Sequence, residues 1–483
     1  MSLKHNPVSG TFQKRLGLFD STAIVTGSMI GSGIFIVSSD ISRNVGAPGW
    51  LLVTWAATAV LTLFAAMTYG ELASLFPHTG GQYVYIRKAY NPLVGFLYGW
   101  ASLLVIQSGT IAAVAMAFAK FTGVLIPWIG EKNILFEWGF LKVSTVHLIA
   151  IGSILFLTWI NTNGISTGKI IQNIFTSTKV FILLGMIVAG IFITSNIEAV
   201  KLNREVFWDA AKAGPGGPVP LAGFALVAGI VTAMVGSLFS SDAWNNITFA
   251  SDEVINPHRN IPLGLIFGTL IVSVLYLLVN VAYLQSLPLR GAVDGLTVAE
   301  KGMQFAVDDR IGTAAMHGLL GGNAALVMAV LIMISTFGCN NGLILSGARI
   351  YYAMAVDGLF FKKAGILNSR GVPGRALVFQ GAYASLLCLS GTYSNLLDYV
   401  IFTVLLFYIL SIVAVFVFRY KMPDAERAFK AVGYPVIPVI YIVAVVFIMI
   451  VLAAYKPLYT WPGLIIVALG IPVYFIWKKK ESF

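Results

Sequence analysis

Two segments of this sequence combine residue types that could bind a small charged molecule inside an apolar chain. The first covers residues 27–35 (GSMIGSGIF) and holds three glycines within seven residues, and each glycine destabilises a helix interior by roughly 1 kcal/mol. If a helix breaks and restarts here, the amides of Ser32 and Gly33 would face an anion such as a carboxylate. The carbonyl groups of Met29 and Ile30, at the end of the preceding half-helix, would suit an ammonium group.

The second segment, residues 239–246 (FSSDAWNN), places a polar run in another apolar stretch. An acid such as Asp242 is expensive at membrane depth, so a functional role is the default hypothesis for it. Two broken helices, five spans apart, are what an inverted repeat of five plus five helices predicts, with the binding site between the breaks. The alternative is that the small residues around Gly31 only allow close helix packing, but packing alone does not explain the matched positions.

Lys179 lies in the middle of a further apolar stretch, within residues 176–181 (TSTKVF). Its ammonium group cannot easily reach either membrane surface from there, so it should face the protein interior and pair with carbonyl groups, a hydroxyl or an acid. A fixed ammonium group would act as a built-in cation. The alternative is a purely structural tie between helices.

Long membrane-spanning helices must position these residues, and the composition predicts them. Of the 483 residues, 58% are hydrophobic and 11% are charged, whereas soluble domains contain about 25% charged residues. The apolar stretches are continuous rather than alternating, which favours helices over an outer-membrane barrel. We therefore expect an all-α membrane protein with twelve spans, near residues 18–46, 49–76, 92–123, 143–162, 168–194, 221–250, 262–286, 323–355, 375–391, 396–420, 434–455 and 460–477.

The lysine and arginine residues fall mainly in loops, so the net charge of +11 indicates membrane topology rather than nucleic-acid binding. Their excess in alternate loops places both termini of a multi-pass cell-membrane protein in the cytoplasm. No cleavable signal peptide is expected. The expected divisions are a cytoplasmic segment 1–17, a first inverted repeat 18–194, a second repeat 195–420 with an outer loop 287–317, two further spans in 421–478, and a cytoplasmic tail 479–483.

The cysteines, histidines and remaining charged residues of the sequence indicate no second binding or catalytic site. Cys339 and Cys388 lie in apolar runs, so neither a disulfide framework nor a cysteine-rich metal site is available. The five histidines form no ligand-spaced cluster, and we expect no metal or cofactor. Glu71 and Arg349 are expected to contact headgroups or loops, with a gate role as the alternative. Within the outer loop, residues 298–307 are expected to form a short amphipathic helix, the alternative being a solvated loop.

Two other function classes are disfavoured. A channel would need a continuous polar lining or a charge ring, whereas the polar residues here cluster at the two breaks. A membrane-embedded enzyme would need a nucleophile, a base or a metal assembled inside the spans, and no such pattern is present. The two polar breaks in apolar helices therefore favour binding and transport of a small molecule.

Several motifs together resemble the amino acid-polyamine-organocation superfamily, and within it the L-type amino acid transporter branch. Residues 27–35 resemble the first-helix motif, and residues 69–83 (YGELASLFPHTGGQY) resemble the second helix and its following loop. Residues 239–245 and 253–262 (EVINPHRNIP) resemble the sixth helix and its inner loop. The resemblance runs over nearly the whole chain. It implies twelve spans in two inverted five-helix repeats with helices one and six unwound, and a secondary transporter of L-amino acids that works by alternating access.

The resemblance also implies residue roles. The amides of Ser32 and Gly33 would take the substrate carboxylate, carbonyl groups of both breaks would take its amino group, and Phe239 would form an outer gate. Lys179 matches a fifth-helix lysine that bridges helices one and eight where sodium-coupled relatives bind an ion, so sodium dependence is disfavoured. The implied substrate-binding residues are Met29, Ile30, Gly31, Ser32, Gly33, Thr110, Phe239, Ser240, Ser241, Asp242 and Asn245.

The chain departs from the family pattern in ways that bear on substrate and partners. Phe-Ala-Tyr is common where this chain has residues 239–241 (FSS), so the side-chain pocket is expected to differ. Asp242 could meet a cationic side chain or could bond the unwound backbone, which leaves neutral and cationic substrates open. Exchange is the first choice by resemblance, and proton coupling through Lys179 is the alternative. The loop 124–142 lacks the cysteine that joins animal relatives to a heavy chain, so a stand-alone microbial transporter is expected.

Overall fold

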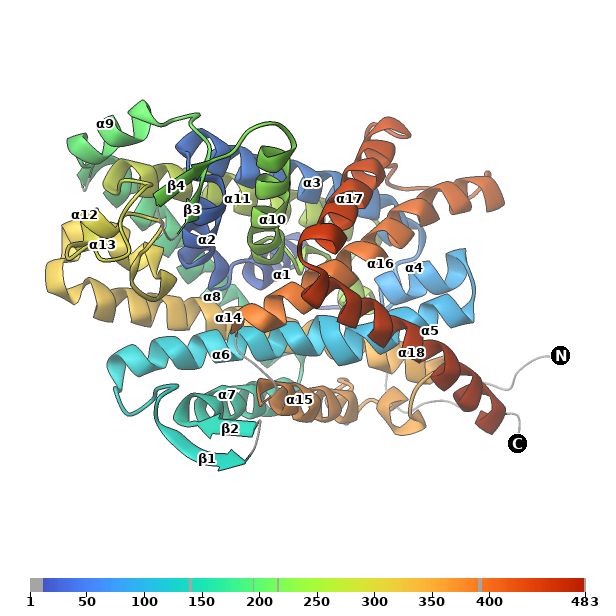
Figure 1. Cartoon of the computed structure of the whole chain (residues 1–483). Coiled ribbons are helices and arrows are strands. Elements are labelled where there is room, and N and C mark those ends of the chain that lie inside the picture. The colour runs from blue at the N-terminus through green and yellow to red at the C-terminus, as the bar shows by residue number, and fades with distance from the viewer. Residues whose placement is uncertain (1–11, 139–140, 194, 215–216, 390–392, 482–483) are drawn as a thin grey trace.

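The computed structural model describes every residue except 1–11, 139–140, 194, 215–216, 390–392 and 482–483. It is a bundle of long helices that run side by side (Figure 1). Ten helices in the described residues are long and apolar enough to cross a membrane by length and composition. The chain is therefore an all-α, multi-pass membrane protein, as its continuous apolar stretches predict. Most of the predicted segment 1–17 and the end of the predicted tail 479–483 lie outside the described residues.

The first half of the chain alternates long helices with short connecting ones. Its helices are α1 (Leu18–Met29), α2 (Val37–Val45), α3 (Pro48–Leu75), α4 (Gln82–Ala89), α5 (Pro92–Ala101), α6 (Gln107–Leu125), α7 (Thr145–Thr162), α8 (Ile165–Val188) and α9 (Ile197–Glu205). A π-helical turn, Ser102–Ile106, joins α5 to α6, and another, Ala189–Ile193, extends α8. The boundaries predicted for the first five spans agree with these helices to within a few residues.

The second half of the chain also contains long helices joined by short ones. Its helices are α10 (Gly223–Ser240), α11 (Pro257–Ser286), α12 (Val298–Lys301), α13 (Ile311–Leu320), α14 (Ala324–Val356), α15 (Gly374–Cys388), α16 (Tyr393–Lys421), α17 (Val436–Tyr455) and α18 (Pro457–Glu481). Two of the twelve predicted spans are not among the ten long apolar helices: the span 18–46 is interrupted, and α15 has 15 residues. Helix α15 nevertheless packs against α6, α7 and α14 inside the bundle.

The first and the sixth predicted spans, 18–46 and 221–250, are interrupted as predicted. Helix α1 ends at Met29, the chain becomes extended at Ile30 (φ −75°, ψ 96°), and a 3₁₀ turn η1 (Gly33–Phe35) leads into α2. Helix α10 is followed by a 3₁₀ helix η4 (Trp244–Glu253). Between them Ala243 has φ 63°, a left-handed conformation that costs a residue with a side chain about 1–2 kcal/mol. Strained backbone of this kind concentrates at ligand sites and switch regions.

The loops differ from the predictions in two ways. Two antiparallel hairpins, β1–β2 (Ile134–Trp138 with Leu141–Ser144) and β3–β4 (Ala211–Gly214 with Gly217–Pro220), are not foreseen by the apolar pattern. The predicted amphipathic helix over 298–307 is wrong, because α12 is a single turn that ends at Lys301 and is followed by Gly302 (φ 55°).

Because glycine readily adopts a positive φ, Gly302 terminates the helix α12. At the other end of α12, the amides of Leu296 and Thr297 donate to the Glu300 carboxylate and lower the pKa of that carboxyl. The turn is therefore capped at both ends, and the longer helix of this outer loop is α13 instead.

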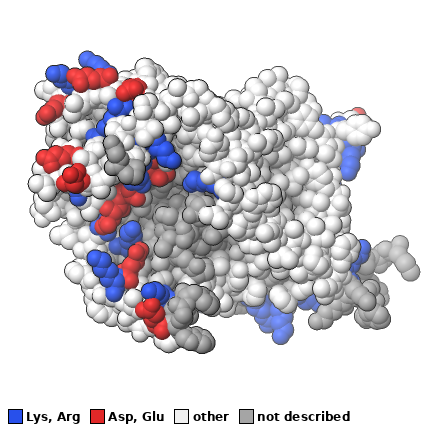
Figure 2. All heavy atoms as spheres, in the orientation of Figure 1, with Lys and Arg blue, Asp and Glu red and all other residues white. Residues whose placement is uncertain are grey.

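The two ends of the bundle are distinct. At one end Leu16 forms a backbone bridge with Val254, and the indole of Trp477 donates to the carbonyl oxygen of Gly358 (3.1 Å); we call this the N/C end. The opposite end carries α9, α12 and α13 (Figure 1) and is called the loop end. On the face seen in Figure 2, charged side chains gather at the loop end and a broad band beside them is almost uncharged. Such a band fits the apolar layer of a membrane.

Candidate functional site

The two interrupted helices contact each other at their breaks. A Cβ atom on Gly33 would lie 2.0 Å from Oγ and 3.2 Å from Cα of Ser240, so the approach requires a glycine. The phenol hydroxyl of Tyr276 in α11 lies within hydrogen-bond distance of the carbonyl oxygens of Met29 (3.1 Å) and Ser240 (3.2 Å). One hydroxyl group thus joins the ends of both half-helices.

Lys179 of α8 is 1% exposed and anchors the first break. Its Nζ donates to the carbonyl oxygens of Gly27 (2.7 Å) and Ile30 (2.9 Å). The hydroxyl of Ser335 in α14 donates to the carbonyl oxygens of Ile30 (3.3 Å) and Gly31 (3.1 Å). The ammonium group of Lys179 therefore bonds carbonyl groups at the end of α1 and just after it. Ser335 supplies the hydrogen bonds from α14, the eighth predicted span, to the same stretch.

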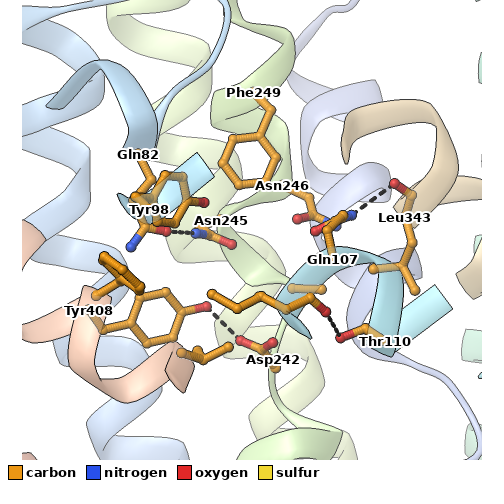
Figure 3. A pocket seen from close by; sticks show the side chains of 14 residues that line it. Gln82, Tyr98, Gln107, Thr110, Asp242, Asn245, Asn246, Phe249, Leu343 and Tyr408 are labelled. Atoms are coloured by element: carbon orange, nitrogen blue, oxygen red, sulfur yellow. Dashed lines mark hydrogen bonds between the residues drawn. The ribbon is translucent and has the colours of Figure 1, made fainter. Parts of the chain in front are cut away.

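A small pocket lies beside the second break (Figure 3). Its walls bring the predicted site residue Thr110 together with two others from a distant segment, Asp242 and Asn245. The hydroxyl of Tyr408 in α16 donates to Asp242 Oδ1 (2.5 Å), and Asn245 Nδ2 donates to Gln82 Oε1 in α4 (2.8 Å). Because an ionised carboxylate can accept about four hydrogen bonds, Asp242 retains capacity to accept from a ligand.

The other predicted site residues lie outside the walls of this pocket. Ser241 lines a second pocket that shares Asp242 and Tyr408 with the first, whereas Phe239 lines neither of the two. The remaining ones are buried in or beside the breaks: Met29, Ile30, Gly31, Ser32, Gly33 and Ser240. The carbonyl groups of Met29 and Ile30 already accept from Tyr276 and Lys179. An amino group would bind them through their second lone pairs or displace these donors.

Comparison with known proteins identifies the family. The sequence model described as amino acid permease matches residues 16–476. The chain belongs to this family. It is 28% identical to b(0,+)-type amino acid transporter 1 of Homo sapiens, over 99% of this chain and 92% of that protein. It is 29% identical to large neutral amino acids transporter small subunit 2 of Mus musculus, over 97% of this chain and 82% of that protein. The resemblance to the L-type branch is thereby confirmed.

Three residues that the sequence analysis does not single out are central to the site of this permease. Tyr276 joins the two breaks, Tyr408 holds Asp242, and Gln82 holds Asn245. A tyrosine inside an apolar helix signals that its hydroxyl has a partner, but the signal does not say which one. Gln82 lies within the motif 69–83, so a closer inspection of that motif could have found it.

The N/C end of the permease contains a buried ion pair. Arg349 Nε lies 3.0 Å from Glu253 Oε1, and both side chains are 1% exposed. The backbone carbonyl oxygen of Glu253 accepts hydrogen bonds from the amides of Arg15 (2.9 Å) and Leu16 (3.0 Å). The expectation that Arg349 contacts headgroups or loops is therefore wrong, because its partner is the buried last residue of η4.

Glu71 of α3 is also buried, at 1% exposure. Its carboxylate oxygens lie 2.6 Å from Arg419 Nη2 and 3.1 Å from Arg427 Nε, and they accept from the amide of Ala431 (2.7 Å). All three partners belong to the end of α16 or to the segment that follows it. Glu71 thus ties α3 to the loop between α16 and α17, so the expected loop contact is confirmed.

The close contact of Gly33 with Ser240 gives a direct test of the site in this permease. We expect Gly33→Ala to lower transport about tenfold, because overpacking a tight contact costs roughly 1–3 kcal/mol and the new Cβ would lie 2.7 Å from the Ser240 Cβ. Gly185→Ala in α8 is the matched control, since its Cβ would meet nothing within 4 Å. Initial uptake rates in proteoliposomes measure both variants; equal rates would mean that the breaks need no close approach.

Proposed function

We propose that this permease is a secondary active transporter that exchanges neutral L-amino acids across the cell membrane, without sodium and with both termini in the cytoplasm. The observation that carries the proposal is the contact between two broken helices at Gly33 and Ser240, beside a polar pocket. A substrate bound there would bridge the unwound segments, and closure on one side of the membrane would permit opening on the other. The N/C end would then be the cytoplasmic end.

The proposed recognition of the amino acid uses the ends of the half-helices. The first amides of the turn η1, including Gly33, have no partner earlier in that turn, as at the start of any helix, and would bind the substrate carboxylate together with the Ser32 amide. Carbonyl groups at Met29, Ile30, Phe239 and Ser240 would bind the substrate amino group. Thr110, Ser241 and Asn245 would face the side chain, and Phe239 would cover the site from the loop end.

Counterflow in proteoliposomes tests the proposal. Vesicles that contain purified protein and unlabelled amino acids should take up labelled amino acid in a saturable way, and replacing sodium with choline should leave the rate unchanged. Screening all common amino acids identifies the substrate. Absence of counterflow with every amino acid would contradict the proposed function, and a requirement for sodium would contradict the role assigned to Lys179.

A cationic or proton-coupled permease is the second candidate, because a buried carboxylate, Asp242, lines the pocket. If this carboxylate contacts a cationic side chain, Asp242→Asn should weaken lysine transport about tenfold or more, since hydrogen bonds to charged groups contribute about 1.5–3 kcal/mol, and should spare leucine. Asp209→Asn at the loop end, with a side chain 65% exposed, is the matched control. Equal loss of lysine and leucine transport would assign Asp242 a structural role.

Proton coupling is tested separately. An imposed pH gradient should leave exchange unchanged in the proposed mechanism, whereas it would drive net uptake if Lys179 titrates during the cycle.

We further propose that the permease acts without a disulfide-linked partner. Both cysteines of the chain, Cys339 and Cys388, are buried in α14 and α15, which supports this part of the proposal. The division into two inverted repeats, 18–194 and 195–420, stays a prediction. As a member of a permease family, the protein is proposed to move its substrate unchanged rather than to act as an enzyme.

A further inference from the structure

Two amide side chains of the pocket wall have nitrogen atoms without a partner. Gln82 is 2% exposed and Asn246 is 1% exposed. Within the described part of the chain, neither Gln82 Nε2 nor Asn246 Nδ2 has a hydrogen-bond partner, although both residues line the pocket beside Asp242. Buried polar atoms in native proteins are nearly always paired, and exceptions call for an explanation such as a ligand. Two exceptions in one pocket point to a ligand with an acceptor group.

The hydrogen bonds within the pocket wall indicate which atoms are left for that ligand. Gln82 Oε1 already accepts from Asn245 Nδ2 (2.8 Å), so Nε2 is the atom that Gln82 has left to offer. In Figure 3 the Gln82 and Asn246 side chains lie above Asp242 and Thr110, with Asn245 between the two amides. Thr110 donates its hydroxyl proton to the carbonyl oxygen of Ile106 (2.7 Å), so Asp242 is the strong acceptor on that side. The pocket therefore offers two amide donors opposite one carboxylate acceptor.

We propose that this pocket is a carboxamide subsite that binds the side chain of an amino acid such as glutamine. This inference rests on the proposed function and deepens it by naming a substrate class. The carboxamide oxygen would accept from Gln82 Nε2 and Asn246 Nδ2, and the carboxamide NH₂ group would donate to Asp242. A side chain with both a donor and an acceptor satisfies the pocket completely.

Other side chains satisfy the pocket less well. A cationic side chain brings only donors, so it would pair with Asp242 but would leave the two amide nitrogens unpaired. An acidic side chain would place a second negative charge beside the Asp242 carboxylate. A hydrocarbon side chain would leave both amide nitrogens unpaired and would give Asp242 no donor beyond Tyr408. Sites that are built to hydrogen-bond a substrate reject analogues that lack the polar group more strongly than apolar pockets reject polar analogues.

Competition in the counterflow assay tests the subsite on the wild-type protein. Glutamine and methionine have similar lengths, and only glutamine carries the carboxamide. We expect glutamine to compete with labelled substrate at a concentration about tenfold lower than methionine, or lower still, since the three proposed hydrogen bonds of the carboxamide distinguish them. Equal or stronger competition by methionine would overturn the subsite. Stronger competition by lysine than by glutamine would also overturn it, because Asp242 alone would then set the preference.

Two variants separate the donors from the rest of the pocket. Asn246→Leu and Gln82→Met each replace an amide with an apolar side chain of similar size, and each should reduce the glutamine-to-methionine preference several-fold. Gln285→Met, the same change at the end of α11 outside this pocket, should leave the preference unchanged. An unchanged preference in Asn246→Leu would overturn the proposal.

The possible failures are distinguishable. Gln82→Met also removes the acceptor for Asn245, so a variant that does not fold is set aside and Asn246→Leu together with the wild-type competition series decides. Methionine counterflow without a glutamine preference in the wild type would reject the carboxamide subsite and leave the proposed transport function standing. Absence of counterflow with any amino acid would reject the transport function itself.

Discussion

Replacing Lys179 with alanine is expected to lower amino acid exchange about 100-fold, because each hydrogen bond to a charged group contributes about 1.5–3 kcal/mol and two are lost. The ammonium group holds the carbonyl groups of Gly27 and Ile30 at the end of the first half-helix. Without it, the Gly27 carbonyl group loses this donor and the Ile30 carbonyl group keeps only Ser335 among the described residues, so the break that receives the substrate loses much of its fixed geometry. Initial counterflow rates, normalised to the amount of monodisperse protein, measure the effect.

Thr178→Ala is the matched control for this prediction. Thr178 is the preceding residue of α8, and its hydroxyl donates to the carbonyl oxygen of Ile174 in the same helix (2.9 Å). Its loss should leave the rate near that of the wild type. If Lys179→Ala itself transports at the wild-type rate, the account of this residue fails. If the variant loses folded protein as well as transport, Lys179 is a structural tie between α1 and α8 instead.

The helix breaks could be predicted from the sequence because their causes are local. The glycines of residues 27–35 and the polar run of residues 239–246 weaken the helices in which they stand. Lys179 is a similar case, since its depth in an apolar stretch excludes solvent and leaves carbonyl groups, hydroxyls or acids as its partners. The structure shows carbonyl groups in that position.

Specific pairings between distant segments could not be predicted. Asn245 bonds Gln82 across 163 positions, and Tyr408 bonds Asp242 across 166 positions. A polar residue in an apolar helix is expected to have a hydrogen-bond partner, but several other polar residues in the spans could be that partner. Packing of the helices decides among them. The same limit applies to Arg349, because its partner Glu253 lies 96 positions away and the sequence alone does not reveal the pairing.

Glu253 connects three parts of the N/C end. Its side chain pairs with Arg349 in α14, and its backbone carbonyl group accepts from the amides of Arg15 and Leu16, just before α1. Glu253 is also the last residue of η4, the half-helix that follows the second break. This ion pair is therefore linked by direct contacts to the start of α1 and to the end of η4, which belong to the two interrupted helices of the proposed substrate site.

Replacing Arg349 with methionine is expected to destabilise the protein by about 3–5 kcal/mol, because removing one partner of a buried ion pair leaves the other charge uncompensated. Glu253 would then be buried with no guanidinium group beside it. The double variant Arg349→Met with Glu253→Gln should recover part of this loss, since no unpaired charge remains in the interior. The temperature at which half of the detergent-solubilised protein unfolds measures the series.

An exposed ion pair supplies the matched control. Lys142 and Glu137 pair at 2.7 Å, with side chains 60% and 48% exposed, and Lys142→Met should cost less than about 1 kcal/mol because water screens such pairs. A double variant as unstable as Arg349→Met alone would show that the arginine acts through packing rather than through charge. A restored unfolding temperature without restored exchange would show that the ion pair sets the position of helix six as well as the stability of the N/C end.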